Sequence, residues 1–289
     1  MAVKPFPHPI HFFLVALLFK DTYSYHRSFN LEITGVIDPE IDVGWVSFVT
    51  VSLLHRRRRI GEKTLYDMHI ILDEKNEVTI KLEGFQIQSM VRFRDFALKM
   101  MPKLKANRQK SKQAPVMAAL DTDDNGHELF ISIDLGHMLE TSILDLTVQF
   151  VNKRIRIVFK ISSGNPVDLA FGWCQFQLKK DKTSLAFLDG HFDIQPDKCE
   201  IVMEGEPEIA DPVFSGKAVL KGVKTYDNSK SWLALAIQAF EMEVNLDKVV
   251  MGEAQAAEDE EDEGNEGNEG GEGDKGDKAY VPDGRRRRR

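Results

Sequence analysis

Residues 155–204 decide the expected fold and read IRIVFKISSGNPVDLAFGWCQFQLKKDKTSLAFLDGHFDIQPDKCEIVME. The apolar side chains at 155, 157, 159 and 161 alternate with basic ones at 154, 156 and 160, so one face of this strand should be buried. Turn-forming residues at 162–166, 180–182 and 195–198 separate further runs of the same kind. The stretch therefore predicts at least four successive strands of an antiparallel sheet.

Working outward, the same patterns predict a mainly β chain with two Ig-like antiparallel β-sandwich units, short helices and a disordered acidic tail. The expected parts are an N-terminal apolar segment (1–26), a first β-rich unit (27–101), a charged linker (102–126), a second β-unit (127–247) and the tail (248–289).

Charge is distributed unevenly along the 289 residues, which carry a net charge of −8. Most of the excess lies in residues 253–289, a Glu/Asp/Gly-rich run without an apolar pattern that ends in five arginines, 285–289. Such a composition predicts disorder, because it cannot offset the entropy of ordering. The rest of the chain is close to neutral, so no specific nucleic-acid partner is expected.

Two short amphipathic helices are expected, at residues 93–101 and 232–240, where apolar residues recur at i, i+3, i+4 and i+7. Ser231 is placed to cap the second helix. The predicted buried stripes are Phe93, Phe96, Ala97 and Met100 in the first helix, and Trp232, Leu235, Ala236 and Ala239 in the second.

Two apolar runs allow more than one interpretation. Residues 10–19 have the length of a signal-peptide core but lack its flanks and are too short to span a bilayer, so the alternatives are a weak signal or anchor and a buried strand. Residues 43–54 are followed by His55 and four arginines, 56–59. These arginines either face anionic lipid or nucleic acid or form the solvated end of a hairpin.

One segment partly matches a calcium-binding loop. Residues 121–126, DTDDNG, agree with positions 1, 3, 5 and 6 of the EF-hand pattern. Position 12 should be glutamate and is Ser132, and the flanks are typical of a loop and a strand. The alternatives are a calcium site and a polar turn before a strand at 129–133.

The two cysteines, Cys174 and Cys199, fall in neighbouring predicted strands. A disulfide between them is geometrically conceivable, and two free thiols in the core are the alternative. Two cysteines make neither a disulfide scaffold nor a zinc site.

No residues are assigned to catalysis, a cofactor or a metal. The histidines at 55, 127, 137 and 191 are scattered, and no nucleophile–base or paired-carboxylate spacing stands out. The chain is therefore predicted not to be an enzyme.

Three segments carry a family resemblance: the Asn-Pro turn and following strand at 163–172, the Pro-led strand at 195–205, and the Ser-Trp-Leu helix with its closing strand at 231–246. In this order the second unit resembles the LEA-type (late embryogenesis abundant, water-stress and hypersensitive-response) β-sandwich. More closely, it is similar to the repeat of fungal vacuolar membrane proteins. A fainter likeness covers 27–101.

The resemblance implies a non-enzymatic structural or interaction module at the vacuole or endomembranes, without cofactors, whose partner is membrane lipid or a membrane protein. A soluble cytoplasmic location follows if residues 10–19 are not an anchor. Two alternatives remain open: a carrier of lipid or another apolar ligand, and an acidic-tailed chaperone for basic proteins.

Overall fold

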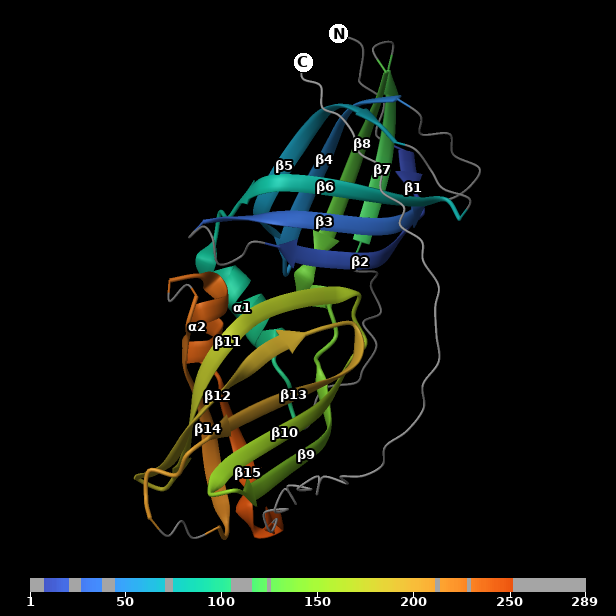
Figure 1. Ribbon diagram of the computed structural model, residues 1–289. Coiled ribbons are helices and arrows are strands. Elements are labelled where there is room, and N and C mark those ends of the chain that lie inside the picture. Colours follow the sequence, from blue (N-terminus) through green and yellow to red (C-terminus); the bar gives the residue numbers. More distant parts are fainter. Residues whose placement is uncertain are drawn as a thin grey trace, which may run out of the picture. The chain divides into compact units, whose positions relative to one another are not determined.

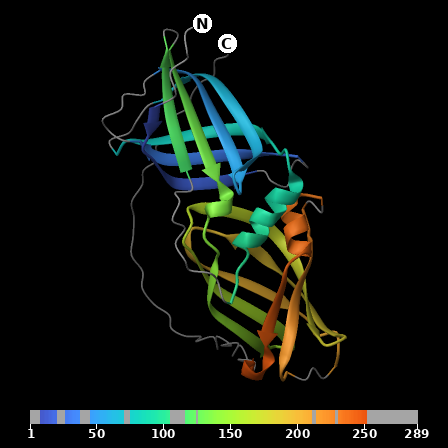
Figure 2. The ribbon, with the colours of Figure 1, turned by 180° about the vertical axis from the view of Figure 1, so that it is seen from behind.

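The computed structural model of the protein describes residues 8–20, 27–37, 45–70, 75–104, 116–123, 126–210, 214–227 and 230–251. Within these residues the chain is mainly β, with two sheets and two short helices, as the sequence predicts (Figures 1 and 2). Neither helix is long and apolar enough to cross a membrane.

A five-stranded sheet has the order β1-β7-β8-β4-β5, and an eleven-stranded sheet runs β16-β9-β10-β13-β12-β11-β2-β3-β6 with β14 and β15 added beside β11. The first sheet contains β1 (His8–Ile10), β4 (Trp45–His55), β5 (Arg58–His69), β7 (Val116–Asp123) and β8 (Gly126–Asp134). The second contains β2 (Phe12–Lys20), β3 (Ser28–Ile37), β6 (Glu77–Gln86), β9 (Ser142–Val151), β10 (Arg154–Ser163), β11 (Val167–Lys180), β12 (Thr183–Ile194), β13 (Asp197–Gly205), β14 (Lys217–Thr225), β15 (Glu241–Asn245) and β16 (Val250–Met251). The helices are α1 (Met90–Met100) and α2 (Trp232–Gln238), with 3-10 turns η1 (Leu135–His137) and η2 (Leu246–Lys248).

Strand β2 joins the N-terminal part (β1–β8 and α1) to the C-terminal part (β9–β16 and α2). It pairs with β3 on one edge and in parallel with β11 on the other, with Leu17 opposite Val167 and Phe19 opposite Leu169. Residues 12–19 therefore lie in an inner strand, as the strand alternative predicts, but only in part buried, since Phe13 and Val15 are exposed. The pairs β4–β8 and β16–β9 are also parallel, whereas the sequence predicted antiparallel units.

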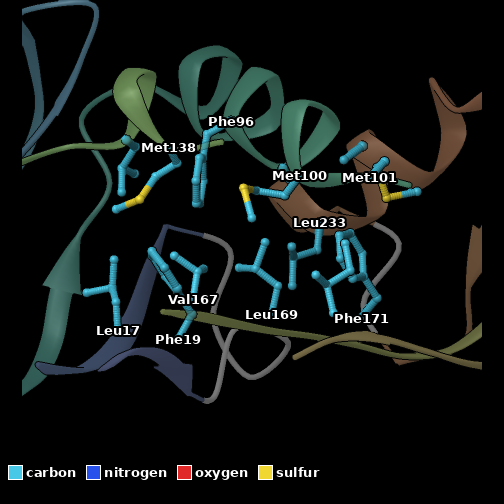
Figure 3. Packing of buried hydrophobic residues seen from close by; sticks show 14 of the residues in the cluster. Leu17, Phe19, Phe96, Met100, Met101, Met138, Val167, Leu169, Phe171 and Leu233 are labelled. Atoms are coloured by element: carbon cyan, nitrogen blue, oxygen red, sulfur yellow. The ribbon is translucent and has the colours of Figure 1, made fainter. Parts of the chain in front are cut away.

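Both helices lie against the sheet where the two parts meet. Figure 3 shows Phe96, Met100 and Met101 facing the side chains of β2 and β11. Helix α1 forms because its apolar residues lie on one side, and the predicted stripe is the buried one. Helix α2 begins at Ser231, whose Oγ accepts a hydrogen bond from the Ala234 amide at 3.0 Å, as predicted.

The buried face of α2 differs from the predicted stripe. Leu235 is only half-buried and Ala239 is exposed. The helix instead buries Leu233 and Ile237, because it is covered by α1 on one side and by β14 on another. A single stripe at i, i+3 and i+4 predicts burial on one side of a helix only, so it misses the second side.

The predicted domain boundaries shift in two places. Residues 102–126 were expected to be a linker, but 116–123 form β7 of the five-stranded sheet. Strand β8 also belongs to this sheet, so the N-terminal part extends past the predicted boundary at 126. At the other end, 248–251 include β16, and the rest of the predicted tail lies outside the described residues.

Candidate functional site

The hairpin turn between β4 and β5 is built on a buried carboxylate. Arg56 and Arg57 form the turn with φ of 52° and 62°, a conformation unfavourable for residues with a Cβ. Asp134, at the end of β8, offsets this: its Oδ1 accepts the Arg56 amide and its Oδ2 the Arg57 amide, both at 3.1 Å. The four arginines at 56–59 are exposed, which confirms the interpretation as a hairpin end.

Close packing behind the turn requires glycine. Gly136 in η1 donates its amide to Asp134 Oδ1 at 2.8 Å. A Cβ on Gly136 would stand 2.7 Å from the Arg56 amide nitrogen, closer than Cβ atoms come to other atoms. The turn, Asp134 and η1 therefore form one hydrogen-bonded unit that fixes where Arg56 stands.

Helix α1 brings two lysines to the same place. Lys99 donates from Nζ to the Gly136 carbonyl at 2.7 Å, and burial lowers the pKa of its ammonium. Beyond the helix, the backbone of Lys103 bridges to β9 through the Thr141 carbonyl and the Ile143 amide, both at 3.1 Å. Its ammonium pairs with Glu140 at 2.6 Å.

These groups line an open cleft of about 390 Å³, called here the basic cleft. Its walls are His55, Arg56, Asp95, Leu98, Lys99, Lys103, Gly136 and Glu140. Three cations and two carboxylates line it. Glu140 pairs with Lys103, one of these cations, and Asp95 pairs at 2.8 Å with Arg94, which is outside the lining, so the lining keeps a net positive charge. The cleft therefore offers positive charge to a ligand.

His55 lines the cleft from β4 and is buried, with 6% of its surface exposed. Its Nδ1 has no hydrogen-bond partner. Burial is the main cause that lowers the pKa of its imidazole; Arg56 and Arg92 lower it further, and Asp134 and Asp95 act in the opposite direction. His55 is therefore held neutral beside the cations.

This lowered pKa predicts a pH dependence of stability. An unfolded His55 takes up a proton near pH 6.5 while the folded one resists, so stability should fall as pH drops below about 6.5, by no more than about 1.4 kcal/mol per pH unit. Urea unfolding at pH 7.5 and 5.5 checks this. His55→Gln has no such proton and should lose less stability over the same interval; an equal loss in both proteins would contradict the assignment.

The other three histidines, at 127, 137 and 191, lie in different parts of the structure. His137 Nδ1 lies 3.1 Å from Oδ2 of Asp134, the carboxylate behind the hairpin turn, without forming a hydrogen bond to it. His127 belongs to β8, and His191 pairs with Asp193 on the C-terminal part. His137 is near Asp134 because it lies three residues further along the chain, whereas His55 reaches the electrostatic influence of the same aspartate from the distant strand β4.

The calcium-loop residues belong to a β-hairpin. Asp121 and Asp123 are in β7 and Gly126 opens β8, while 124 and 125 lie outside the described residues. Among the described residues, no group of three or more His, Cys, Asp or Glu side chains is arranged to hold a metal ion.

The cysteines are both free thiols. Cys174 is buried, and burial raises the pKa of its thiol. Cys199 is half-buried on β13, facing Ile161 of β10 in the ladder. Of the two alternatives, free thiols rather than a disulfide are therefore found.

Asn165 is a structural residue rather than a ligand. Its side chain accepts from the Leu139 amide at 2.6 Å and donates to the Leu139 carbonyl at 2.7 Å. The next carbonyl, of Pro166, accepts from the Leu17 amide of β2 at 2.6 Å. The Asn-Pro turn thus helps to hold the two parts of the chain together.

Comparison of the chain with protein-family models and with curated proteins finds no match. The resemblance to the LEA-type sandwich therefore stays a prediction, and the geometry of the chain itself must carry any functional conclusion.

Proposed function

We propose that the protein is a non-enzymatic interaction module that binds a phosphate-bearing ligand in the basic cleft. The observation that carries the proposal is the convergence of Arg56, from the β4–β5 turn, with Lys99 and Lys103, from the end of α1 and the residues after it, on one concave site. Arginine and lysine are the usual partners of phosphate oxygens. A cleft of about 390 Å³ accommodates a phosphomonoester and its first carbons.

Lys99 supports the proposal energetically. Its ammonium has lost part of its hydration, and the Gly136 carbonyl is its only hydrogen-bond acceptor among the described residues. A partly buried cation is stabilised by an anion at hydrogen-bonding distance. The ligand would also favour protonation of His55, so binding should take up a proton and strengthen below neutral pH.

The surroundings favour an interaction surface over a catalytic site. Arg57 and Arg58 extend the positive charge along the hairpin, whereas Arg59 pairs with Glu62. Val91 and Leu104, which are close in sequence to residues of the cleft, have exposed apolar side chains. Both carboxylates of the cleft are engaged in ion pairs, with Lys103 and Arg94. Phosphate on a lipid headgroup and phosphate in solution offer the same chemistry to this surface.

The test is calorimetric titration of the full chain with inorganic phosphate, and with phosphatidylcholine vesicles with or without phosphatidate. Arg56→Gln should weaken binding by about tenfold to a hundredfold, since a charge-assisted hydrogen bond contributes roughly 1.5–3 kcal/mol. Binding of vesicles but not of free phosphate would assign the ligand to a membrane, and the reverse would assign it to solution.

Arg58→Gln is the matched control, because Arg58 lies two positions away on the same hairpin but does not line the cleft. Its affinity should stay within about twofold of the unchanged protein. Equal losses in the two variants would replace the cleft by a diffuse basic surface, and no binding of either probe would end the proposal.

A vacuolar or endomembrane location, implied by the LEA-type resemblance, goes with the membrane outcome of this test. The carrier alternative has one supporting observation, an apolar cleft of about 500 Å³ beside β1 and β7. It is lined by Pro9, Ile10, His11, Val116, Met117, Ala118, Ala119, Phe130 and Ser132. Retention of lipid by the full chain in native mass spectrometry would favour it. The acidic-tail alternative rests on residues outside those described.

A further inference from the structure

A β-bulge in β11 turns a tryptophan outward. The register with β12 shifts between Ala170 and Trp173, and Gly172 adopts a φ of +71°. This positive φ strains any residue with a Cβ, so the bulge favours glycine. Phe171 and Cys174 remain buried on either side, whereas Trp173 is 53% exposed.

Trp173 stands at the side of a surface trough of about 550 Å³, called here the Trp173 trough. Its other walls include Arg154, Phe187, Asp189, His191, Glu204 and Glu206. Gly190 and Gly205, on β12 and β13, contribute bare backbone to the lining. The trough belongs to the C-terminal part, and none of its residues lines the basic cleft.

The lining carries more negative than positive charge. Three carboxylates, from Asp189, Glu204 and Glu206, and one guanidinium, from Arg154, line the trough. Glu204 is paired with Arg156, outside the lining, at 3.2 Å, so Asp189 and Glu206 supply the negative charge. The polar groups are held in place: Asp189 accepts the Tyr226 hydroxyl at 2.7 Å and the Gln175 amide at 3.1 Å. An exposed indole beside fixed carboxylates suits a cation, since the ring face and the carboxylates attract the same charge.

The neighbouring aromatic ring, of Tyr226, already binds a cation of the same chain. Lys224 Nζ lies 4.5 Å from the centre of the Tyr226 ring. The Trp173 ring packs against the His191 ring, with centroids 5.9 Å apart and planes at 71°, and no cation–π contact to Trp173 is found among the described residues. Trp173 is thus the aromatic face of this surface that remains available.

We infer that the Trp173 trough binds a cationic side chain, the guanidinium of Arg or the ammonium of Lys, presented by a basic segment of a partner protein. The cation stacks on Trp173, and the carboxylates of Asp189 and Glu206 supply the countercharge. The site is opposite in charge preference to the basic cleft.

The test uses the full chain and two capped tripeptides, Gly-Arg-Gly and Gly-citrulline-Gly, which differ in charge and hardly in shape. The readout is the amide chemical shift of Gly190 and Gly205, so binding of arginine to the acidic run at 258–277 does not contribute to it. The arginine peptide should shift both amides, and the citrulline peptide should not. Trp173→Ala should weaken the response about fivefold.

Glu206→Gln should weaken the same response and reduce its dependence on salt. Lys182→Gln, an exposed residue in the turn between β11 and β12 and outside the trough, is the matched control and should leave the response unchanged. An equal response to citrulline, a response to a neutral oligosaccharide instead, or full affinity in Trp173→Ala would each overturn the inference.

Discussion

Replacing Trp232 with alanine is expected to lower the free energy of unfolding by about 3–5 kcal/mol, the range for deleting a large aromatic side chain from a core. Trp232 is fully buried. Its ring lies among aromatic rings of β2, β3 and α1, at centroid distances of 5.2–6.3 Å. These rings are Phe19, Phe29, Phe93 and Phe96. The indole thus connects α2 to the N-terminal part, and the variant should also unfold less cooperatively.

Urea unfolding followed by circular dichroism measures the effect. Trp232→Phe should lose much less, because it keeps a ring and removes an indole N–H that is buried without a partner. Trp173→Ala, an exposed tryptophan in the same protein, should change stability by no more than about 0.5 kcal/mol. If Trp232→Ala costs no more than Trp173→Ala, the aromatic cluster does not hold the two parts together.

Replacing Asp134 with alanine is expected to lower the free energy of unfolding by about 3 kcal/mol. Three backbone amides, of Arg56, Arg57 and Gly136, donate to this buried carboxylate. Hydrogen bonds to charged groups contribute roughly 1.5–3 kcal/mol each, and part of that is recovered when water reaches the exposed turn. The positive φ angles at 56 and 57 would then lack their support.

Phosphate titration of the same variant distinguishes this role from a general loss of stability. Without urea, and at a temperature where Asp134→Ala is still folded, the affinity for phosphate should fall, because Arg56 loses its fixed position. Asp145→Ala, an exposed aspartate on β9, should alter neither stability nor affinity. A folded Asp134→Ala protein with unchanged phosphate affinity would contradict the role assigned to the turn.

The alternation of apolar residues in strands and their helical stripes predicted the buried residues correctly where an element has a single buried face. In β10 the predicted inward residues are the buried ones, and in α1 the whole predicted stripe is buried. Strand β7 could have been found in the same way, because Val116, Ala118 and Leu120 are buried in alternation. The basic residues that precede it in sequence concealed this short run.

Long-range contacts could not be predicted from local patterns. Nothing in residues 12–20 indicates β11 as a neighbour, since strand pairing over such a separation leaves no periodic signal. The basic cleft is similar: Arg56, Lys99 and Gly136 come from three distant segments and meet only through Asp134 and the docking of Lys103 on β9. The Trp173 trough depends on a bulge, which alternation alone does not locate.

The parallel pairing of β2 with β11 also sets an order of events during synthesis. Strand β2 leaves the ribosome long before β11, and at 5–20 residues per second the interval is on the order of 10 s. Its partner β3 follows soon, but the second edge of β2 stays unpaired throughout that interval, with apolar side chains beside it. An open, apolar strand edge is a template for pairing with other chains. The growing chain is therefore most exposed to aggregation before residue 169 has emerged.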